Sequence, residues 1–226
     1  MNTYRTLLVD VFTDDPLAGN AAGVVPEAHG LSATQMQAIA RELGASKTAF
    51  LSTTDDADRR IRYFTPTQEV DRCGHATIAS HALLAADGVI DPGVHTLKTN
   101  VGILDIELQE DGVVWMTQSR PAVETVDVDY DRVADALGID AARLKDVGAD
   151  LPIARATTGV SFLIVPVNFL EGLSSVQPDP TAIETLADEH DATGIYAVTF
   201  DTLDAESTLH ARMFAPGAGV DEDPVT

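Results

Sequence analysis

Short apolar or alternating segments, separated by turn residues, fill most of the first half of the chain. A two-residue period of hydrophobic positions is typical of half-buried β-strands, and Gly, Pro, Asn and Asp mark the turns between them. We predict strands at residues 4–12, 48–52, 58–64, 94–99, 102–109 and 113–117, and residues 21–25 form a short apolar run. This half is therefore rich in strands.

Two helices interrupt these strands. Ser32 is a good N-cap for a helix over residues 33–43, whose apolar residues share one face, and Gly44 is a typical stop. The second helix, predicted over residues 76–86, is apolar nearly all round. Such a helix is surrounded by protein, because it has no polar face to turn to water. The first half is predicted to be a shell of strands around one central helix.

Arg120-Pro121 marks the boundary to a second half, so we predict lobes at residues 1–118 and 119–226. The second lobe is predicted to hold helices at 132–137 and 181–189, and strands at 159–167, 195–200 and 208–214. Both halves share a plan of strands, a helix and an acidic turn, which suggests duplication. No apolar helix follows the turn Asp223-Pro224-Val225-Thr226, so we expect the second lobe to be incomplete.

The charge of the chain indicates the environment in which the protein works rather than its chemistry. The 226 residues include 36 acidic and 14 basic residues, a net charge of −22, and the acids are spread along the whole chain. Dispersed aspartate with few lysines predicts an acidic, salt-adapted (halophilic) protein whose self-repulsion is screened by salt. Because no basic stripe is present to neutralise phosphates, nucleic acid is excluded as a partner.

Hydropathy and cysteine content exclude further classes. A hydrophobic content of 45% predicts a globular protein. No run reaches the roughly 18 apolar residues that a membrane helix needs, and the N-terminus lacks a signal-peptide layout, so we expect a cytoplasmic protein without a membrane partner. Cys73 is the single cysteine, which excludes an intramolecular disulfide and a Cys-rich zinc site.

The stretch Cys73-Gly74-His75-Ala76-Thr77 carries the strongest chemical signal. It leads from an extended segment into the apolar helix, so backbone N–H groups and the positive end of the helix dipole converge beside a histidine. Helix N-termini bind carboxylates and phosphates, and an imidazole there can move a proton near neutral pH. The alternative is a buried helix start with a core histidine, and for Cys73 a buried structural thiol.

Four segments at residues 9–25, 36–51, 61–80 and 211–226 extend this signal. They read VDVFTDDPLAGNAAGVV, MQAIARELGASKTAFL, IRYFTPTQEVDRCGHATIAS and ARMFAPGAGVDEDPVT. In this order they make the chain resemble the PhzF family of phenazine-biosynthesis-like isomerases. The resemblance implies the α+β diaminopimelate-epimerase fold: two similar lobes, each a curved, mostly antiparallel sheet around a central helix, with the active site between them.

The resemblance also implies an activity. It predicts a biosynthetic isomerase or epimerase that shuttles a proton on a small cyclic or amino-acid-like carboxylate, without cofactor or metal. The best-known reaction of the family is the isomerisation of a dihydro-hydroxyanthranilate. We expect the protein to be a homodimer.

The matching positions name the site. Gly74-His75 matches the family's first-lobe site, and Asp223 matches the aspartate of its EDPATGS-like loop. The family's acid/base glutamate lies in a Ser-Glu-Thr-x-Phe segment, where this chain has Lys47. Lysine reverses the charge and has a reference pKa about six units higher, although a desolvated lysine can act as a base. The predicted catalytic residues are Lys47, His75 and Asp223, and the predicted substrate-binding residues are Asn20, Cys73, Gly74 and Ala76.

Several alternatives stay open. Lys47 can instead be a solvated residue between helix and strand, and its charge favours a rival function: a catalytically inactive homologue that binds a small molecule or a partner. Related cysteine epimerases use two thiols, but Thr226 stands where the second would be, which excludes that mechanism. Asn20 can be a left-handed turn residue. His81 is interpreted as a core residue, and Asp55-Asp56-Ala57-Asp58 as a solvated turn rather than a metal site.

Overall fold

The computed structural model describes residues 3–145, 147 and 151–223. It divides into two compact units, Met1–Thr117 and Gln118–Thr226. The division falls one residue before the boundary predicted from Arg120-Pro121. Each unit has its own sheet and its own hydrophobic core.

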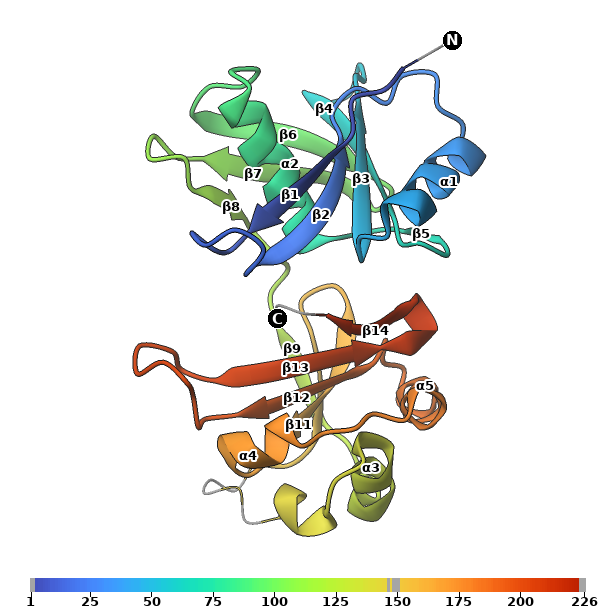
Figure 1. Cartoon of the computed structure of the whole chain (residues 1–226), viewed down its shortest axis with the longest axis vertical. Helices are drawn as coiled ribbons and strands as arrows, with labels where there is room; N and C mark the ends of the chain where they lie inside the picture. The colour runs from blue at the N-terminus through green and yellow to red at the C-terminus, as the bar shows by residue number, and fades with distance from the viewer. Residues whose placement is uncertain (1–2, 146, 148–150, 224–226) are drawn as a thin grey trace. The chain divides into compact units, whose positions relative to one another are not determined.

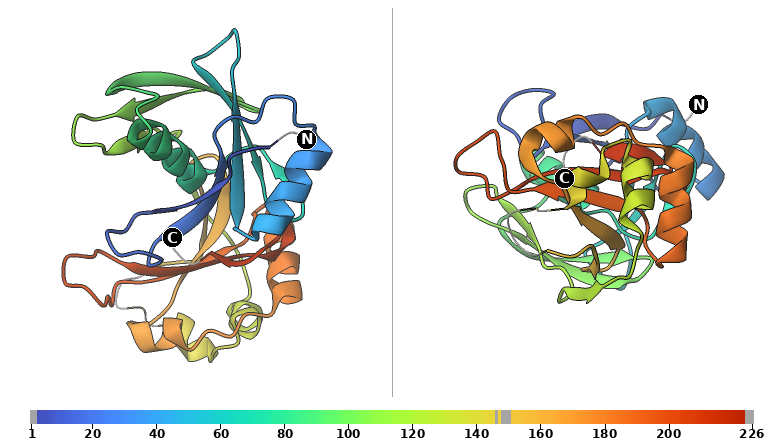
Figure 2. Two further views of the ribbon diagram at one scale, coloured as in Figure 1. Left: turned by 45° about the horizontal axis from the view of Figure 1, so that its top comes forward. Right: turned by 90° about the horizontal axis from the view of Figure 1, so that it is seen from below.

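The first unit is a curved sheet around one helix (Figures 1 and 2). Its strands are β1 (Leu7–Val11), β2 (Asn20–Val25), β3 (Lys47–Ser52), β4 (Arg59–Phe64), β5 (Glu69–Val70), β6 (Gly93–Thr99), β7 (Gly102–Leu108) and β8 (Val114–Met116). Their order is β1-β2-β3-β4-β6-β7-β8, and β5 pairs with β4. Neighbours are antiparallel except for the parallel pairs β2–β3 and β4–β6.

Helix α2 (Gly74–Ala86) lies in the curve of this sheet, as its apolar sequence predicts (Figure 2). It packs against β1, β2, β3 and β8. The predicted start at residue 76 is wrong by two positions, because Cys73 takes the N-cap position and Gly74 is the first helical residue. Gly74 and His75 therefore belong to the first turn of the helix rather than to the loop before it.

Helix α1 (Ala33–Leu43) has the predicted bounds. Ser32 and Gln35 form a capping box, and Gly44 ends the helix at φ 67°. The helix packs on the side of the sheet opposite α2, so alternate residues of β3 enter two cores. Ala49 and Leu51 join the core around α2, whereas Phe50 joins the core with Met36 of α1.

The second unit is a six-stranded sheet in the order β14-β13-β12-β11-β10-β9. Its strands are β9 (Ala122–Thr125), β10 (Ala154–Thr157), β11 (Ser161–Pro166), β12 (Ile195–Thr199), β13 (His210–Ala215) and β14 (Val220–Asp223). Its helices are α3 (Tyr130–Leu137), α4 (Phe169–Ser174) and α5 (Pro180–Glu189), with single 3-10 turns at Ala141–Leu144 and Pro216–Ala218. In the described part of this unit, the three α-helices lie on the same side of the sheet (Figure 1).

Both units thus combine a curved or twisted sheet with few helices, and the fold class is α+β as predicted. The central helix predicted for a lobe of this fold is present in the first unit as α2. No helix occupies an equivalent position among the described residues of the second unit. Residues 224–226, the rest of the predicted turn Asp223-Pro224-Val225-Thr226, lie outside the described residues.

Candidate active site

The N-terminus of α2 is formed by a residue that does not cap it. Cys73 has extended backbone angles of φ −158° and ψ 116°, and its side chain makes no capping hydrogen bond. The N–H groups of the first turn have no partner within a helix, and the helix dipole places positive potential at the same point. This helix head is suited to hold an anionic group, as its sequence predicts.

A chain of buried hydroxyl groups holds this helix head in place. The Oγ1 atom of Thr77 donates to the carbonyl oxygen of Cys73 at 2.7 Å, and the hydroxyl of Tyr63 lies 2.5 Å from the same Oγ1. Because the Thr77 proton is directed to Cys73, Tyr63 is the donor in the second bond. Burial raises the pKa of Tyr63, so its hydroxyl stays protonated. Strand β4 is thereby tied to the first turn of α2.

The thiol of Cys73 faces the imidazole of His75. Its Sγ atom lies 3.6 Å from Nδ1 and 3.9 Å from Nε2 of that ring. Cys73 is 9% exposed and belongs to the core around α2, so its thiol is buried, and its role at the site stays a prediction. His75 is half-buried, which rules out the alternative of a fully buried core histidine.

Two further candidates begin neighbouring strands. Lys47 is the first residue of β3, is half-buried, and its neighbour in the parallel strand β2 is Ala22. Lys47 thus lies in the strand rather than in the segment between helix and strand. Asn20 is the first residue of β2 and is 2% exposed. It does not have a positive φ, so the alternative of a left-handed turn is wrong.

These candidates share one end of the first unit. Strands β2 and β3 are parallel, and α2 packs against both. Their far ends meet at a cavity that Pro26, Ser52 and Leu84 help to line, so all three elements run in the same general direction. The first residues of the three elements are Asn20, Lys47 and Gly74. An amide, an amine and the helix head with His75 therefore lie at the end opposite this cavity.

Close packing of the backbone fixes the position of Asn20. Gly19 precedes it, and a Cβ atom added at Gly19 would lie 2.2 Å from the carbonyl oxygen of Val11. The N–H of Gly19 donates to Asp10 Oδ2 at 3.3 Å. Only glycine allows the chain to pass this closely beside the end of β1.

The candidate Asp223 belongs to the second unit. It is the last residue of β14, pairs with Met213 of β13 and is 8% exposed. The predicted turn around it is thus a strand up to residue 223, because the segment Val220–Asp223 adds to the edge of β13. The proposed roles of Lys47, His75, Asp223, Asn20, Cys73, Gly74 and Ala76 remain predictions.

Other polar residues of the sequence analysis have structural partners. His81 is buried, its Nδ1–H donates to the Thr77 carbonyl at 2.9 Å, and burial lowers its pKa, so the core interpretation is confirmed. The Asp55–Asp58 run connects β3 to β4 as an exposed turn: Asp56 pairs with Lys98, and Asp58 accepts from the N and Oγ1 of Thr96, both at 2.7 Å. Within the described residues, no three acidic, cysteine or histidine side chains form a metal-binding group.

No local pattern in the sequence predicts one ion pair, which joins β4 and β5. Arg62 of β4 donates to both carboxylate oxygens of Glu69, at 2.8 and 2.6 Å, and Asn100 donates to the same carboxylate at 3.0 Å. The hydrogen bond from Arg62 is the main reason that the pKa of Glu69 is lowered. Glu69 begins β5, the short strand that leads into Cys73, so this pair anchors the approach to α2.

In the part of the chain that the structure describes, no helix has the length and apolar character to cross a membrane.

Known proteins resemble this chain over its whole length. The uncharacterized isomerase YfhB of Bacillus subtilis is 36% identical over 231 residues, which cover 100% of this chain and 78% of that protein. The trans-2,3-dihydro-3-hydroxyanthranilate isomerase of Pseudomonas chlororaphis is 32% identical over 235 residues, covering 99% of this chain and 76% of that protein.

Solved structures agree with the sequence relatives. The crystal structure of a phenazine biosynthesis protein of the PhzF family from Bacillus anthracis matches with a TM-score of 0.90 and 33% identity, over 100% of this chain and 77% of that one. The structure of a predicted epimerase from Pseudomonas aeruginosa matches with a TM-score of 0.79 and 26% identity, over 98% and 76%. The fold is therefore that of the diaminopimelate-epimerase type.

The family model for phenazine biosynthesis-like proteins, PhzC-PhzF, matches residues 9–226. That span includes the helix head Cys73-Gly74-His75 and both strands that begin at Asn20 and Lys47. The chain belongs to the PhzC-PhzF family of phenazine biosynthesis-like proteins and is a homologue of its isomerases.

Proposed function

We propose that the protein is a cofactor-independent isomerase or epimerase that transfers a proton on a small cyclic or amino-acid-like carboxylate. The observation that carries this proposal is the head of α2. It combines first-turn N–H groups that no Cys73 side chain caps with a half-buried imidazole beside them. The relationship to a dihydro-hydroxyanthranilate isomerase supports the same class of substrate.

The chemistry follows from these groups. The N–H groups at the helix head hold the substrate carboxylate. When a base removes a proton from the carbon next to it, negative charge develops on the carboxylate oxygens, and the helix dipole stabilises that charge. An acid then returns a proton to another carbon, or to the opposite face of the same carbon. No electrons leave the substrate, so no redox partner is required.

His75 and Asp223 are the proposed proton carriers, and Lys47 is the third. A lysine accepts a proton from carbon only as the free amine, and removal from water favours that form. Lys47 is half-buried at the start of β3, which makes such a role possible. Asn20, Gly74, Cys73 and Ala76 are the proposed substrate contacts.

The same lysine favours a second candidate function. An ammonium group binds a carboxylate but does not abstract a proton, whereas the matching position in the family is a glutamate. A homologue that binds a small carboxylate without converting it would retain the helix head and replace the base. This candidate is distinguished from the isomerase by turnover alone.

The test follows deuterium from solvent into substrate. We would incubate the protein in heavy water with a panel of small carboxylates that includes trans-2,3-dihydro-3-hydroxyanthranilate and proline-like amino acids, and detect incorporation by NMR. The isomerase proposal predicts exchange that the His75→Ala variant loses. His95→Ala is the matched control in the same unit, because its imidazole Nε2 bonds only to the Asp91 carbonyl at 2.8 Å.

The outcomes separate the two candidates. Exchange in the wild type that survives in His75→Ala would contradict the assigned role of the imidazole. No exchange in the wild type, with exchange in Lys47→Glu, would establish the binding homologue instead. If neither protein exchanges and no carboxylate of the panel perturbs the NMR signals of Gly74 or His75, both candidates are wrong.

A further inference from the structure

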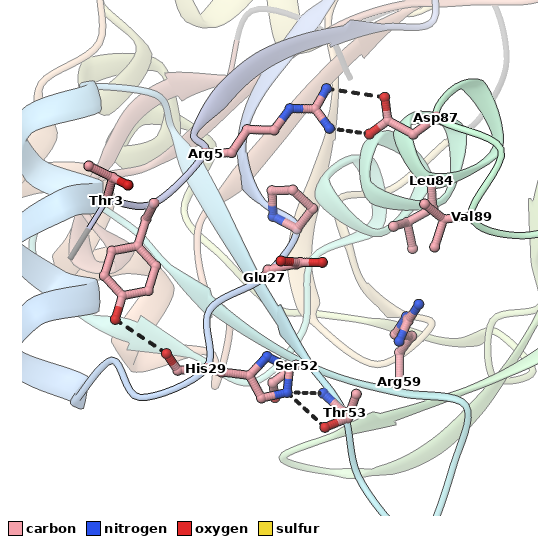
Figure 3. A pocket seen from close by; sticks show the side chains of 12 residues that line it. Thr3, Arg5, Glu27, His29, Ser52, Thr53, Arg59, Leu84, Asp87 and Val89 are labelled. Carbon is pink, nitrogen blue, oxygen red and sulfur yellow. Dashed lines mark hydrogen bonds and ion pairs between the residues drawn. The ribbon is translucent and has the colours of Figure 1, made fainter.

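A cavity of about 310 Å³ lies within the first unit, away from the candidate active site (Figure 3). It is bordered by the ends of β2 and β3, the start of β4 and the C-terminal end of α2. Gly74 begins α2 and Asp87 caps its other end. Since a helix rises about 1.5 Å per residue, the two sites are roughly 20 Å apart.

Paired polar groups form two walls of this cavity (Figure 3). Arg5 pairs with the carboxylate of Asp87, which ties the N-terminal segment to the end of α2. On the other side, His29 Nε2 accepts from the backbone N–H of Thr53 at 3.1 Å and contacts Thr53 Oγ1 at 2.7 Å. These groups compensate one another, so they build the walls without leaving a net charge.

Arg59 and Glu27 differ from these paired residues. Both border the cavity, and neither side chain forms a hydrogen bond or an ion pair with another residue that the structure describes; Arg59 interacts with the adjacent Asp58 through charge alone, and Glu27 is exposed. Arg59 is half-buried, and its guanidinium makes no direct ion pair, in a chain with 36 acidic and 14 basic residues. A partly desolvated guanidinium without a direct hydrogen-bond partner is unfavourable, and an anionic ligand would relieve that cost.

The floor between these charges is apolar. Leu84 is buried at the end of α2, and Val89 and Pro26 border the same space. The volume lies within the range of natural small-molecule sites, which combine apolar lining with a few placed polar groups. The cavity therefore offers one cation, one anion and an apolar surface to a single small ligand.

We propose that this cavity is a second binding site, which takes a small zwitterion with an apolar body, such as an apolar amino acid. The ligand carboxylate binds Arg59, its ammonium group binds Glu27, and its apolar part contacts Leu84 and Val89. The site is independent of the reaction proposed for the head of α2. It needs no residue outside the first unit.

The test uses L-leucine as the probe and methyl NMR as the readout. Titration of the whole chain is expected to shift the methyl signals of Leu84 and Val89 in a saturable manner. Two matched probes each lack one charge: 4-methylpentanoate has no ammonium group, and 3-methylbutylamine has no carboxylate. Both are expected to bind at least about tenfold more weakly, because each loses one charge-assisted contact.

Substitutions test whether Arg59 and Glu27 each bind one charged group of the ligand. Arg59→Gln and Glu27→Gln are each expected to weaken leucine binding about tenfold. Arg59→Lys, which keeps the charge, guards against a folding defect and is expected to retain most of the affinity. Arg60→Gln is the matched control, because Arg60 is the adjacent residue in β4 and donates instead to Asn100 Oδ1 at 2.9 Å.

Three results would overturn the proposal. In the first, leucine would leave the methyl signals of Leu84 and Val89 unchanged. In the second, 4-methylpentanoate would bind as tightly as leucine, which would indicate a simple anion site. In the third, His75→Ala removes leucine binding, which places the ligand at the head of α2. Because the readout is binding at Leu84 and Val89, it stays decisive even if the protein catalyses no reaction.

Discussion

The hydroxyl of Tyr63 donates a 2.5 Å hydrogen bond to Oγ1 of Thr77, in the first turn of α2. Both side chains are buried, and Oγ1 of Thr77 in turn donates to the carbonyl oxygen of Cys73 at 2.7 Å. A strand residue thus holds the helix head that carries the candidate chemistry. Two residues 14 positions apart are joined where neither has access to water as an alternative partner.

The first prediction tests this bond by removing the donor. Tyr63→Phe deletes one hydroxyl and leaves the Thr77 oxygen buried with one bond fewer, so we expect a loss of about 1–2 kcal/mol in the free energy of unfolding. Urea unfolding followed by circular dichroism measures it. Tyr196→Phe is the control, because the hydroxyl of this half-buried tyrosine bonds to no described residue. Equal stabilities of the two variants would contradict the assigned role of Tyr63.

The second prediction concerns alkaline pH. Burial raises the pKa of Tyr63 above its ordinary value near 10, so the folded protein keeps this proton to higher pH than the unfolded chain does. The resulting stability is complete below about pH 10 and is lost as the pH rises further, towards the pKa of the folded state. The free energy of unfolding should therefore fall steeply above about pH 10. In Tyr63→Phe the slope should be shallower; an unchanged slope would rule out this tyrosine as its source.

The third prediction concerns acid pH and the Arg62–Glu69 pair. The pKa of Glu69 is lowered, so its contribution to stability is present above the ordinary glutamate pKa of about 4.5 and is lost as the pH falls through the lower folded value. Glu69→Gln should weaken this dependence on pH in acid unfolding curves. Glu124→Gln is the control, because Glu124 pairs with Arg155 but is 69% exposed, and exposed pairs contribute little. If both variants follow the wild-type curve, the Arg62–Glu69 pair does not anchor β5.

The fourth prediction concerns salt. A net charge of −22 on 226 residues repels itself at low ionic strength. Raising KCl from about 0.1 M to about 1 M shortens the screening length from about 10 Å to about 3 Å. We expect the melting temperature to rise by about 4 °C or more over this range, in differential scanning calorimetry. Sucrose, which adds no ions, controls for general solvent effects, and a melting temperature that does not rise with KCl would contradict salt adaptation.

Local signals in the sequence were sufficient for part of the fold. Helix α1 has the predicted bounds, because Ser32 and Gly44 satisfy its ends with groups that lie next to it in the chain. The burial of α2 also follows from its own residues, since a helix apolar on every face has no stable place in water. The same sequence signals located the helix head Cys73-Gly74-His75.

Strands that depend on distant partners were missed. Strand β9 is exposed at all four residues, so it shows no alternation, and it is a strand only because β10 pairs with it. Strand β5 has two residues and exists through its pairing with β4. Strand β14, which ends at Asp223, likewise forms because β13 offers its edge.

The sequence by itself determined the family, the helix head and most elements of the first unit, because caps, periodicity and motifs are properties of neighbouring residues. The tertiary structure decided that Asn20 and Lys47 begin strands at the same end as Gly74. It also paired Tyr63 with Thr77 and left Arg59 and Glu27 facing one cavity. These relationships join residues far apart in the chain. They arise only when folding brings distant elements together, and no local pattern records which residues will meet.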